Sequence, residues 1–379
     1  MIYLDNAATT MVSDRVMDAM KPYFNCSYGN PGSIHEAGLA AKQAIELARK
    51  QVARVINADP KQIIFTSGGT EANNLALVNA TEQMLRKGKN HMIVSAVEHP
   101  SVIQCVAFLQ EHMGIEVSVV YPDRSGQIGF FDVRKLIREN TGLVSVMAVN
   151  NELGILNPFW VIGRMCASYG IPFHTDCVQA YGNIPINVVN DSIDYLSVSA
   201  HKFHGPKGVG FLFARKPCNM KPMIHGGGQE NGLRSGTENV PLIVGMGAAA
   251  DGIDHYIRAD LHTANELREE FFHLVSAAGG VTVNGKPYNG SKILNLRFDG
   301  VDGQTLVLML SGKGVCVSAG SACSAHKNEP SHVLKAIGLT DEQARSSIRV
   351  SLSRYTTMEE VVSAAEAIVE SVKILRGEL

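Results

Sequence analysis

The chain has 379 residues, of which 45% are hydrophobic and 18% charged, and its formal net charge is −2. This composition excludes a disordered chain and supplies enough apolar residues for one large or two ordinary domains, while the near-neutral charge argues against general binding to nucleic acid or membrane surfaces. The seven cysteines are scattered and include no CxxC pair, which argues against a disulfide framework or a structural zinc site.

The N-terminal segment, MIYLDNAATT, has an early aspartate and lacks a basic region followed by a long apolar run. We therefore expect no signal peptide. The apolar run Val240–Ala250 is too short to span a bilayer. The sequence predicts a cytoplasmic protein that does not depend on a membrane.

Short apolar runs alternate with helical patterns through the first two thirds of the chain. Helical patterns cover residues 38–56 and 132–139. The runs are continuously apolar, which is typical of strands buried on both faces, so the alternation predicts a parallel sheet covered by helices. The predicted strands are Gln62–Ser67, His91–Ala96, Glu116–Pro122, Leu143–Asn150, Ile171–Asp176 and Ile193–Ala200.

The pattern changes near residue 250. One long helical stretch is predicted over residues 249–278, followed by short strands near residues 291–298 and a C-terminal helix over 357–377. We place a domain boundary here. Residues 13–255 are expected to form a large cofactor-binding domain. Residues 1–12 and 256–379 are expected to form a smaller α+β domain, which carries a cysteine loop at about 318–332.

A lysine stands directly after one predicted strand, in SAHKFHGPKGVG. Ligands of α/β sheets bind at strand ends, so Lys202 is a candidate for a Schiff base with a carbonyl cofactor. The ordinary alternative is an exposed loop lysine, and for a single lysine that alternative is the commoner one.

Other polar groups follow neighbouring strands. HTDCVQA places Asp176 at a strand end, where a carboxylate can cap a helix or keep a pyridine nitrogen protonated. TSGGTEANNLA is a strand, a glycine-rich turn and a helix start, which favours a phosphate or simply joins two elements. VEHPSV contains His99, a structural histidine or a ring that stacks on a cofactor, and VNNELG offers Asn150 and Asn151. Each signal is weak alone, but together they indicate a pyridoxal-phosphate site.

Cys323 lies in SAGSACSAHKNEPSH, residues 318–332, a run of small and polar residues. Such a composition predicts an exposed, mobile loop, where a thiol is an oxidation hazard unless it has a chemical task. The neighbouring His326 and Lys327 would favour its thiolate form.

Taken together, these motifs resemble the NifS/IscS-type cysteine desulfurases, the long-loop branch of the class V aminotransferase family. The resemblance extends from Tyr3 to Thr357. It implies the α/β fold of pyridoxal-phosphate fold type I, with a mainly parallel seven-stranded sheet between helices and a smaller α+β domain. The matching segments are YLDNAATT, GNPGSIHEAG, TSGGTEANNLA, EHPSV, VNNELG, HTDCVQA, SAHKFHGPKGVG, GGGQENGLRSGTEN, SAGSACSAHKNEPSHVL and IRVSLSRYTT.

The resemblance also implies site residues. Pyridoxal 5'-phosphate would be bound to Lys202, with Asp176 at its pyridine nitrogen and His99 stacked on its ring. Lys202, Cys323 and His99 would be catalytic, and Asn151 and Arg349 would bind the substrate. The cofactor-binding set would be Gly69, Thr70, His99, Asn151, Asp176, Gln179, Ser199, His201, Lys202 and, from the second subunit of a homodimer, Thr237.

The implied reaction converts L-cysteine to L-alanine and leaves a persulfide on Cys323. The sulfur would serve iron-sulfur cluster assembly, tRNA thiolation or both, through an acceptor protein. No metal site is expected, and transient ligation of an iron-sulfur cluster by Cys323 is left open. The alternatives are a selenocysteine lyase, another class V enzyme such as an aminotransferase, and a catalytically silent scaffold.

Five positions depart from the family pattern without removing a catalytic group. They leave the acceptor and the substrate geometry open. These positions are Met11, Gly32, Trp160, Cys177 and His204.

Overall fold

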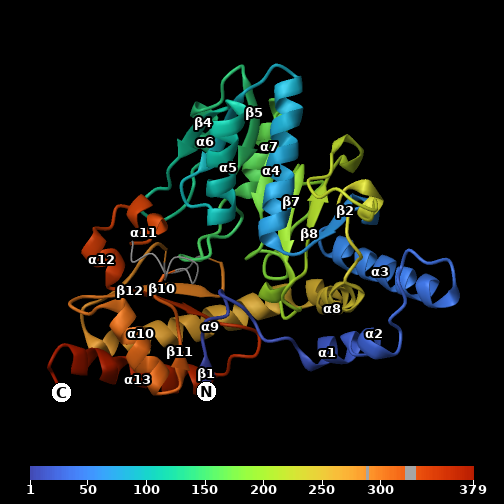
Figure 1. Ribbon diagram of the computed structural model, residues 1–379. Coiled ribbons are helices and arrows are strands. Elements are labelled where there is room, and N and C mark those ends of the chain that lie inside the picture. The colour runs from blue at the N-terminus through green and yellow to red at the C-terminus, as the bar shows by residue number, and fades with distance from the viewer. Residues whose placement is uncertain (287–289, 321–329) are drawn as a thin grey trace.

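The computed structural model describes residues 1–286, 290–320 and 330–379 (Figure 1). Its strands are β1 (Ile2–Tyr3), β2 (Ile63–Thr66), β3 (His91–Ser95), β4 (Glu116–Val120), β5 (Thr141–Ser145), β6 (Phe173–Asp176), β7 (Tyr195–Ser199), β8 (Gly210–Ala214), β9 (Val281–Val283), β10 (Ile293–Phe298), β11 (Val315–Cys316) and β12 (Ser347–Ser351). Its α-helices are α1 (Asp14–Met20), α2 (Pro22–Asn25), α3 (Glu36–Val55), α4 (Gly69–Arg86), α5 (Pro100–Met113), α6 (Phe130–Lys135), α7 (Phe159–Ser168), α8 (Val240–Ala250), α9 (Ile257–Val275), α10 (Gly303–Gly312), α11 (His332–Ala336), α12 (Asp341–Arg345) and α13 (Met358–Leu375).

A seven-stranded sheet forms the centre of the larger part of the molecule. Its strand order is β2-β8-β7-β6-β5-β3-β4, and β8 runs antiparallel to both of its neighbours while the other pairs are parallel. The predicted mainly parallel seven-stranded sheet is therefore confirmed. Each of the six predicted strands overlaps an observed one, whereas β8 was missed.

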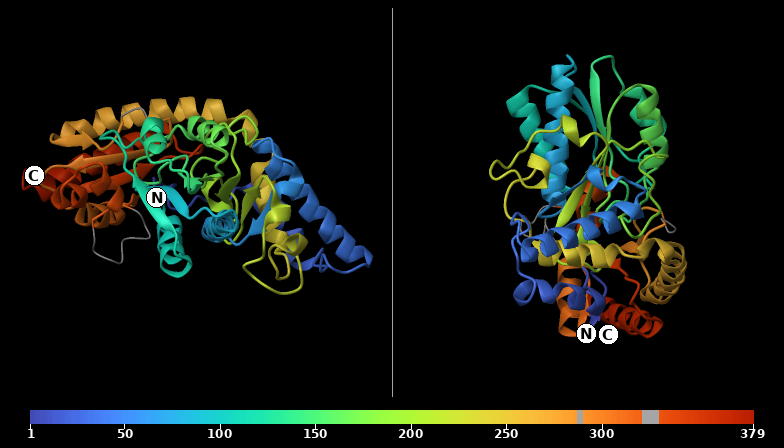
Figure 2. Two further views of the ribbon diagram at one scale, coloured as in Figure 1. Left: turned by 90° about the horizontal axis from the view of Figure 1, so that it is seen from above. Right: turned by 90° about the vertical axis from the view of Figure 1, so that its right-hand side faces the viewer.

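Alternate side chains of these strands enter two different hydrophobic cores. Ile63 and Phe65 of β2 pack in the core that contains α3, α7 and α8, whereas Ile64 packs in the core that contains α4 and α5. Met92 and Ile93 of β3 divide in the same way. Because successive side chains of a strand point to opposite faces, a sheet covered on both faces requires continuously apolar strands. Figure 2 shows helices on both sides of the sheet.

A second, smaller assembly contains both chain ends, at the bottom of Figure 1. Here β10 pairs antiparallel with β12 and β9, and β1 pairs parallel with β11. Leu4 is fully buried in its core, together with Phe271 of α9, Leu310 of α10 and Ile368 of α13. The chain's first residues thus pack with its last third. The exact domain boundary at residues 255 and 256 stays a prediction.

Two helical regions differ from simple expectation. The stretch over residues 249–278 is not one helix: α8 ends at Ala250, and Gly252 at φ 77° turns the chain before α9 begins. The left-handed conformation at Gly252 cannot continue a helix. Val333 and Leu334 of α11 pack with the core of the large sheet, as do Ile337 and Ala344, although the flanking strands β11 and β12 contribute to the core of the small assembly. Among the described residues, no helix is long and apolar enough to cross a membrane.

Candidate active site

A cavity of about 220 Å³ lies where the chain leaves the carboxyl ends of the central strands. Its lining includes all but two of the residues predicted for the site, drawn from segments that follow β2, β3, β5, β6 and β7 and from β12. Parallel strands bring their carboxyl ends to one edge of a sheet, which explains the convergence. The predicted residues in its wall are Gly69, Thr70, His99, Asn151, Asp176, Gln179, Ser199, His201, Lys202 and Arg349.

Lys202 ends the short 3-10 turn that directly follows β7. Its Nζ donates to the backbone oxygens of Ala7 at 2.5 Å and Ala8 at 2.8 Å. Gln179 Nε2 donates to the same Ala7 oxygen at 2.9 Å. The N-terminal segment therefore lies directly against the candidate Schiff-base lysine, and these carbonyls orient its amine.

Asp176 is the last residue of β6 and is only 3% exposed. Its Oδ2 accepts a hydrogen bond from Asn73 Nδ2 at 2.7 Å, and its Oδ1 accepts one from the backbone N–H of Val178 at 2.9 Å. These two donors fix the carboxylate in the cavity wall. Such a group is suited to hold a proton on a ring nitrogen.

His99 is the N-cap of α5. The backbone N–H of Ser101 donates to His99 Nδ1 at 3.1 Å, and the Ser101 hydroxyl lies 2.8 Å from the same nitrogen. Because Nδ1 accepts, the proton of the neutral ring is on Nε2. Burial is the main cause that lowers the pKa of His99, with Asp176 acting in the opposite direction. Asn73 Nδ2 also donates to the Ser101 hydroxyl, so one network links Asp176 to His99.

The turn between β2 and α4 requires glycine because its neighbours approach closely. A Cβ on Gly69 would lie 2.6 Å from Val178 Cγ2, and a Cβ on Gly210 would lie 2.8 Å from the Cα of Gly68. The N-terminal turn of α4 therefore reaches the cavity wall beside Thr70 and Ser199. Amide and hydroxyl donors at a helix N-terminus suit an anionic group. The residues present thus fit the phosphate of the implied cofactor.

Two titratable side chains near this turn add no net negative charge to it: His201 is neutral, and Glu71 is paired with Arg234. Burial lowers the pKa of His201 to about 4. Glu71, in the first turn of α4, accepts from Arg234 Nε at 2.9 Å and from the backbone N–H of Ser67 at 2.8 Å. Arg234 therefore offsets a negative charge that would otherwise oppose an anion at this helix end.

Glu98 precedes His99 and is fully buried. Its Oε1 accepts from the Ser95 hydroxyl at 2.5 Å and from the backbone N–H of Met147 at 2.7 Å, while its Oε2 has no hydrogen-bond partner among the described residues. Burial raises the pKa of this carboxyl to about 8. The side chain is therefore mainly neutral at neutral pH and supports the strand ends beneath His99.

The two remaining predicted site residues are Cys323 and Thr237. Cys323 lies outside the described residues, so its predicted position at the border of the cavity stays a prediction. Described residues on either side of this segment are anchored: Ser318 pairs with Arg349, and Ser331 Oγ donates to Glu152 Oε2 at 2.5 Å. Thr237 lines a different cavity with Arg234 and Glu238.

The structure shows the contacts or burial of three residues that depart from the family pattern, Cys177, His204 and Trp160. Cys177 is fully buried, and burial raises the pKa of its thiol well above the ordinary value, in keeping with packing rather than catalysis. His204 has a left-handed backbone with φ 68°, and its N–H donates to Thr10 Oγ1 at 2.8 Å. Trp160 packs edge-on against Phe159 with ring centroids 5.2 Å apart.

Several residues of the cavity wall were missed by reasoning from the sequence. Asn73 belongs to the motif TSGGTEANNLA, but its spacing from the glycines of that motif does not indicate contact with Asp176. The contribution of the N-terminal segment depends on pairing across almost the whole chain. The missed residues are Ala7, Ala8, Asn73, Ser101, Met147 and Val178.

Comparison with known proteins agrees with this geometry. The model of the aminotransferase class-V family matches residues 2–363. A cysteine desulfurase IscS from Dictyoglomus turgidum is 43% identical over 99% of this chain and 96% of its own length. A solved NifS-like protein is 37% identical with a TM-score of 0.91 over 98% of this chain and 99% of that one. A structure of SspA in complex with cysteine is 37% identical with a TM-score of 0.82, over 94% and 100% of the two chains.

This chain therefore belongs to the NifS/IscS-type cysteine desulfurases of the class-V aminotransferase family. The family resemblance predicted from the motifs and the fold type are both confirmed.

Proposed function

We propose that this protein is a cysteine desulfurase that converts L-cysteine to L-alanine and transfers the sulfur to Cys323 as a persulfide. The observation that carries the proposal is the single cavity in which Lys202, Asp176, His99 and Arg349 meet. Full-length relatives named cysteine desulfurase support the same activity.

Pyridoxal 5'-phosphate would be held by residues that fit each of its groups. Lys202 would bind it covalently, Asp176 would pair with its pyridine nitrogen, and His99 would lie on its ring. When bound, this cofactor supplies an electron sink for bond changes at the substrate's α-carbon. The phosphate would be held by Gly69, Thr70, Ser199 and His201, and completed by Thr237 of the second subunit, with Gln179 and Asn151 near the phenolic oxygen and the substrate.

Two residues move protons in this proposal. Lys202 Nζ, which two carbonyls orient, accepts the α-proton of the substrate. His99 carries its proton on Nε2, because the backbone N–H of Ser101 occupies Nδ1. A lowered pKa keeps the ring neutral at neutral pH, so Nε2 can exchange a proton with the substrate's thiol.

Cys323 takes the sulfur. Its thiolate attacks the substrate sulfur, so that a sulfur–sulfur bond forms while the bond between Cβ and sulfur breaks. The electron pair of the broken bond stays with the substrate carbon, which gains a proton and becomes the methyl group of alanine. Arg349 would bind the substrate carboxylate throughout, for which a planar guanidinium is suited.

The test is intact-mass analysis of the holoenzyme after incubation with L-cysteine. The wild type is expected to gain one sulfur atom and to form alanine. Cys323→Ser should lose both results while keeping the absorption band of the lysine-bound cofactor. Cys218→Ser is the matched control, since Cys218 is exposed and does not line the cavity.

Full desulfurase activity in Cys323→Ser would contradict the proposal. Selenocysteine as substrate separates the main alternative, because selenium elimination can dispense with a nucleophilic cysteine. A selenocysteine lyase would keep its turnover of L-selenocysteine in Cys323→Ser, and its wild type would prefer L-selenocysteine to L-cysteine.

The acceptor of the sulfur would be an iron-sulfur scaffold or a tRNA-thiolation protein in the cytoplasm. Capture of the persulfidated protein with its bound acceptor would identify which of these it serves. We further propose a homodimer, because five large hydrophobic side chains between residues 11 and 34 are more than half exposed. They are Met11, Met17, Phe24, Tyr28 and Ile34.

A further inference from the structure

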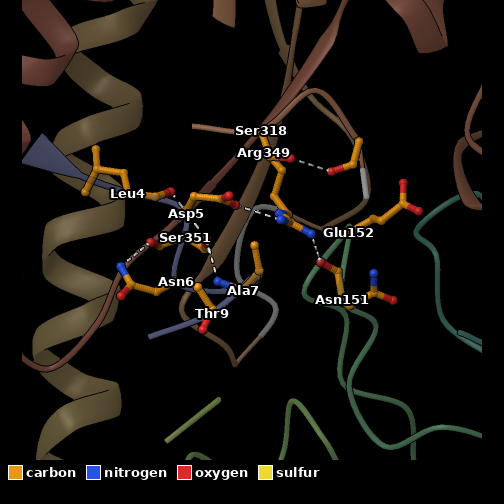
Figure 3. Close-up of polar contacts among 12 residues, drawn as sticks. Leu4, Asp5, Asn6, Ala7, Thr9, Asn151, Glu152, Ser318, Arg349 and Ser351 are labelled. Carbon is orange, nitrogen blue, oxygen red and sulfur yellow. Dashed lines mark hydrogen bonds and ion pairs between the residues drawn. The ribbon is translucent and has the colours of Figure 1, made fainter. Parts of the chain in front are cut away.

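Arg349 lies in the middle of β12 and is only 1% exposed. A guanidinium keeps its charge at every pH that proteins experience, so burial is costly unless an anion and hydrogen-bond acceptors surround it. Its Nη2 donates to Asp5 Oδ1 at 2.7 Å, and its Nη1 donates to the backbone oxygen of Asn151 at 2.9 Å (Figure 3). Its Nε is buried and has no hydrogen-bond partner among the described residues.

Asp5 approaches this guanidinium from outside the cavity. Arg349 belongs to the cavity wall, whereas Asp5 does not, although its carboxylate contacts Nη2. The carboxylate therefore does not occupy the space that a ligand would use. It holds one edge of the guanidinium, so the N–H groups that it does not engage are left for another acceptor.

The position of Asp5 is fixed by the backbone on either side of it. The residues 4–10, which we call the N-terminal strap, run beside the end of β12. Ser351 N–H donates to the Leu4 oxygen at 2.7 Å, and Ala7 N–H donates to Ser351 Oγ at 2.8 Å. Asp5 and Ser351 form a parallel bridge. The same strap provides the Ala7 and Ala8 oxygens that accept from Lys202.

We propose that Asp5 is a positioning residue for the carboxylate of the amino-acid substrate. Its carboxylate fixes the Arg349 guanidinium, so that the N–H groups not engaged by Asp5 and Asn151 are held in place for the substrate carboxylate. The inference rests on the proposed function, since it takes Arg349 as the group that binds the substrate carboxylate. Asp5 could have two other roles, and removal of its carboxylate would then have different consequences. If the ion pair with Arg349 is purely structural, removal would change only stability. If Asp5 competes with the substrate carboxylate for Arg349, removal would strengthen substrate binding.

The experiment measures ligand binding as well as turnover in the holoenzyme. Binding of L-alanine is followed by the change in cofactor absorbance, and KM and kcat are measured with L-cysteine. For Asp5→Ala we expect the Kd for L-alanine and the KM for L-cysteine to rise about 10- to 100-fold, with kcat changed less than about threefold. Asp5→Asn should recover most of the loss, because its amide oxygen can still accept from Nη2.

Asp299→Ala is the matched control. Asp299 pairs with Arg297 of β10 at 3.2 Å, but it is 61% exposed and neither residue lines the cavity. Its Kd and KM should equal those of the wild type. Unchanged or lower Kd and KM in Asp5→Ala would overturn the inference, and so would L-alanine binding that is unaffected by Arg349→Ala.

If Asp5→Ala does not fold, Asp5→Glu provides the second test. It keeps the charge but moves the carboxylate by one methylene, so a raised KM at an unchanged thermal midpoint is expected. An unchanged KM in Asp5→Glu would overturn the inference. Binding of L-alanine requires no sulfur transfer, so a failed desulfurase assay and a failed role for Asp5 are distinguishable.

Discussion

The cavity has two sides that are built differently. The sheet side consists of Gly69, Thr70, His99, Asp176, Ser199, His201 and Lys202, each placed just beyond the end of a central strand or at that end. The seam side consists of Ala7, Ala8 and Arg349, which come from the strap and from β12. Asp5 and Arg349 are 344 residues apart in sequence. In the proposed reaction, the sheet side supplies the groups that take part in bond changes, whereas the seam side supplies groups that orient the substrate and the lysine.

Substitution of Lys202 should have the largest effect on activity of any change on the sheet side. Lys202→Ala removes both the amine that would bind the cofactor and the proton acceptor, so activity should fall at least about 10³-fold. Absorption spectra should lack the band of the lysine-bound cofactor. Lys207→Ala, an exposed lysine of the same motif, should retain both. A Lys202→Ala enzyme with the band intact would place the covalent site elsewhere.

Asp176→Asn tests whether the sheet side acts through charge. The substitution keeps the size of the side chain but removes the negative charge, and we expect turnover to fall at least about 100-fold. Thermal unfolding should change little by comparison. Asp194→Asn is the control, because Asp194 lies before β7 at the opposite end of the sheet. Equal losses in the two variants would show that the effect is structural.

Arg349→Lys tests whether the seam side mainly binds. A lysine keeps the positive charge but loses the planar fork, so KM for L-cysteine should rise about 10- to 100-fold with a smaller change in kcat. Steady-state kinetics separates the two constants. A large fall in kcat with an unchanged KM in Arg349→Lys would show that the seam side does not act mainly in substrate binding.

Glu98→Gln gives the smallest expected effect and concerns stability. The folded pKa of Glu98 is about 8 and its ordinary value is 4.5, so the folded protein keeps a proton that the unfolded chain releases above pH 4.5. The stability from this proton is complete below pH 4.5 and is lost as pH rises through 8. The variant should therefore lose less unfolding free energy between pH 5 and pH 9, by roughly 1 to 4 kcal/mol.

Denaturant unfolding of the holoenzyme at several pH values measures this difference. Glu116→Gln on the edge strand β4 is the control, because its side chain is about half exposed. If the unfolding free energies of Glu98→Gln and the wild type changed in parallel with pH, the assignment of a neutral Glu98 carboxyl beneath His99 would be wrong.

The sequence was most informative where local patterns decide the structure. Continuous apolar runs identified six strands, and polar residues at their ends identified most of the sheet side. β8 was missed because Gly208 and Gly210 resemble a turn, although Gly210 is required where β8 passes close to Gly68. The long helical pattern near residue 250 gave no warning that Gly252 would adopt a left-handed conformation.

The seam side could not be predicted in the same way. YLDNAATT was recognised as a family motif, yet no local pattern indicated that Asp5 would meet Arg349 or that Ala7 and Ala8 would meet Lys202. These contacts depend on strand pairing between the chain's beginning and its end. Local periodicity carries no information on such pairing.

The pairing of the strap has a consequence for biosynthesis. Residues 2–7 are synthesised long before their partners at residues 314–316 and 347–351. The central sheet can form as its strands emerge, because its last strand ends at Ala214. The carbonyls that orient Lys202 and the carboxylate that holds Arg349 take their places only after release of almost the whole chain. Maturation of the enzyme is therefore expected to finish with the docking of the strap, a segment synthesised long before its partners.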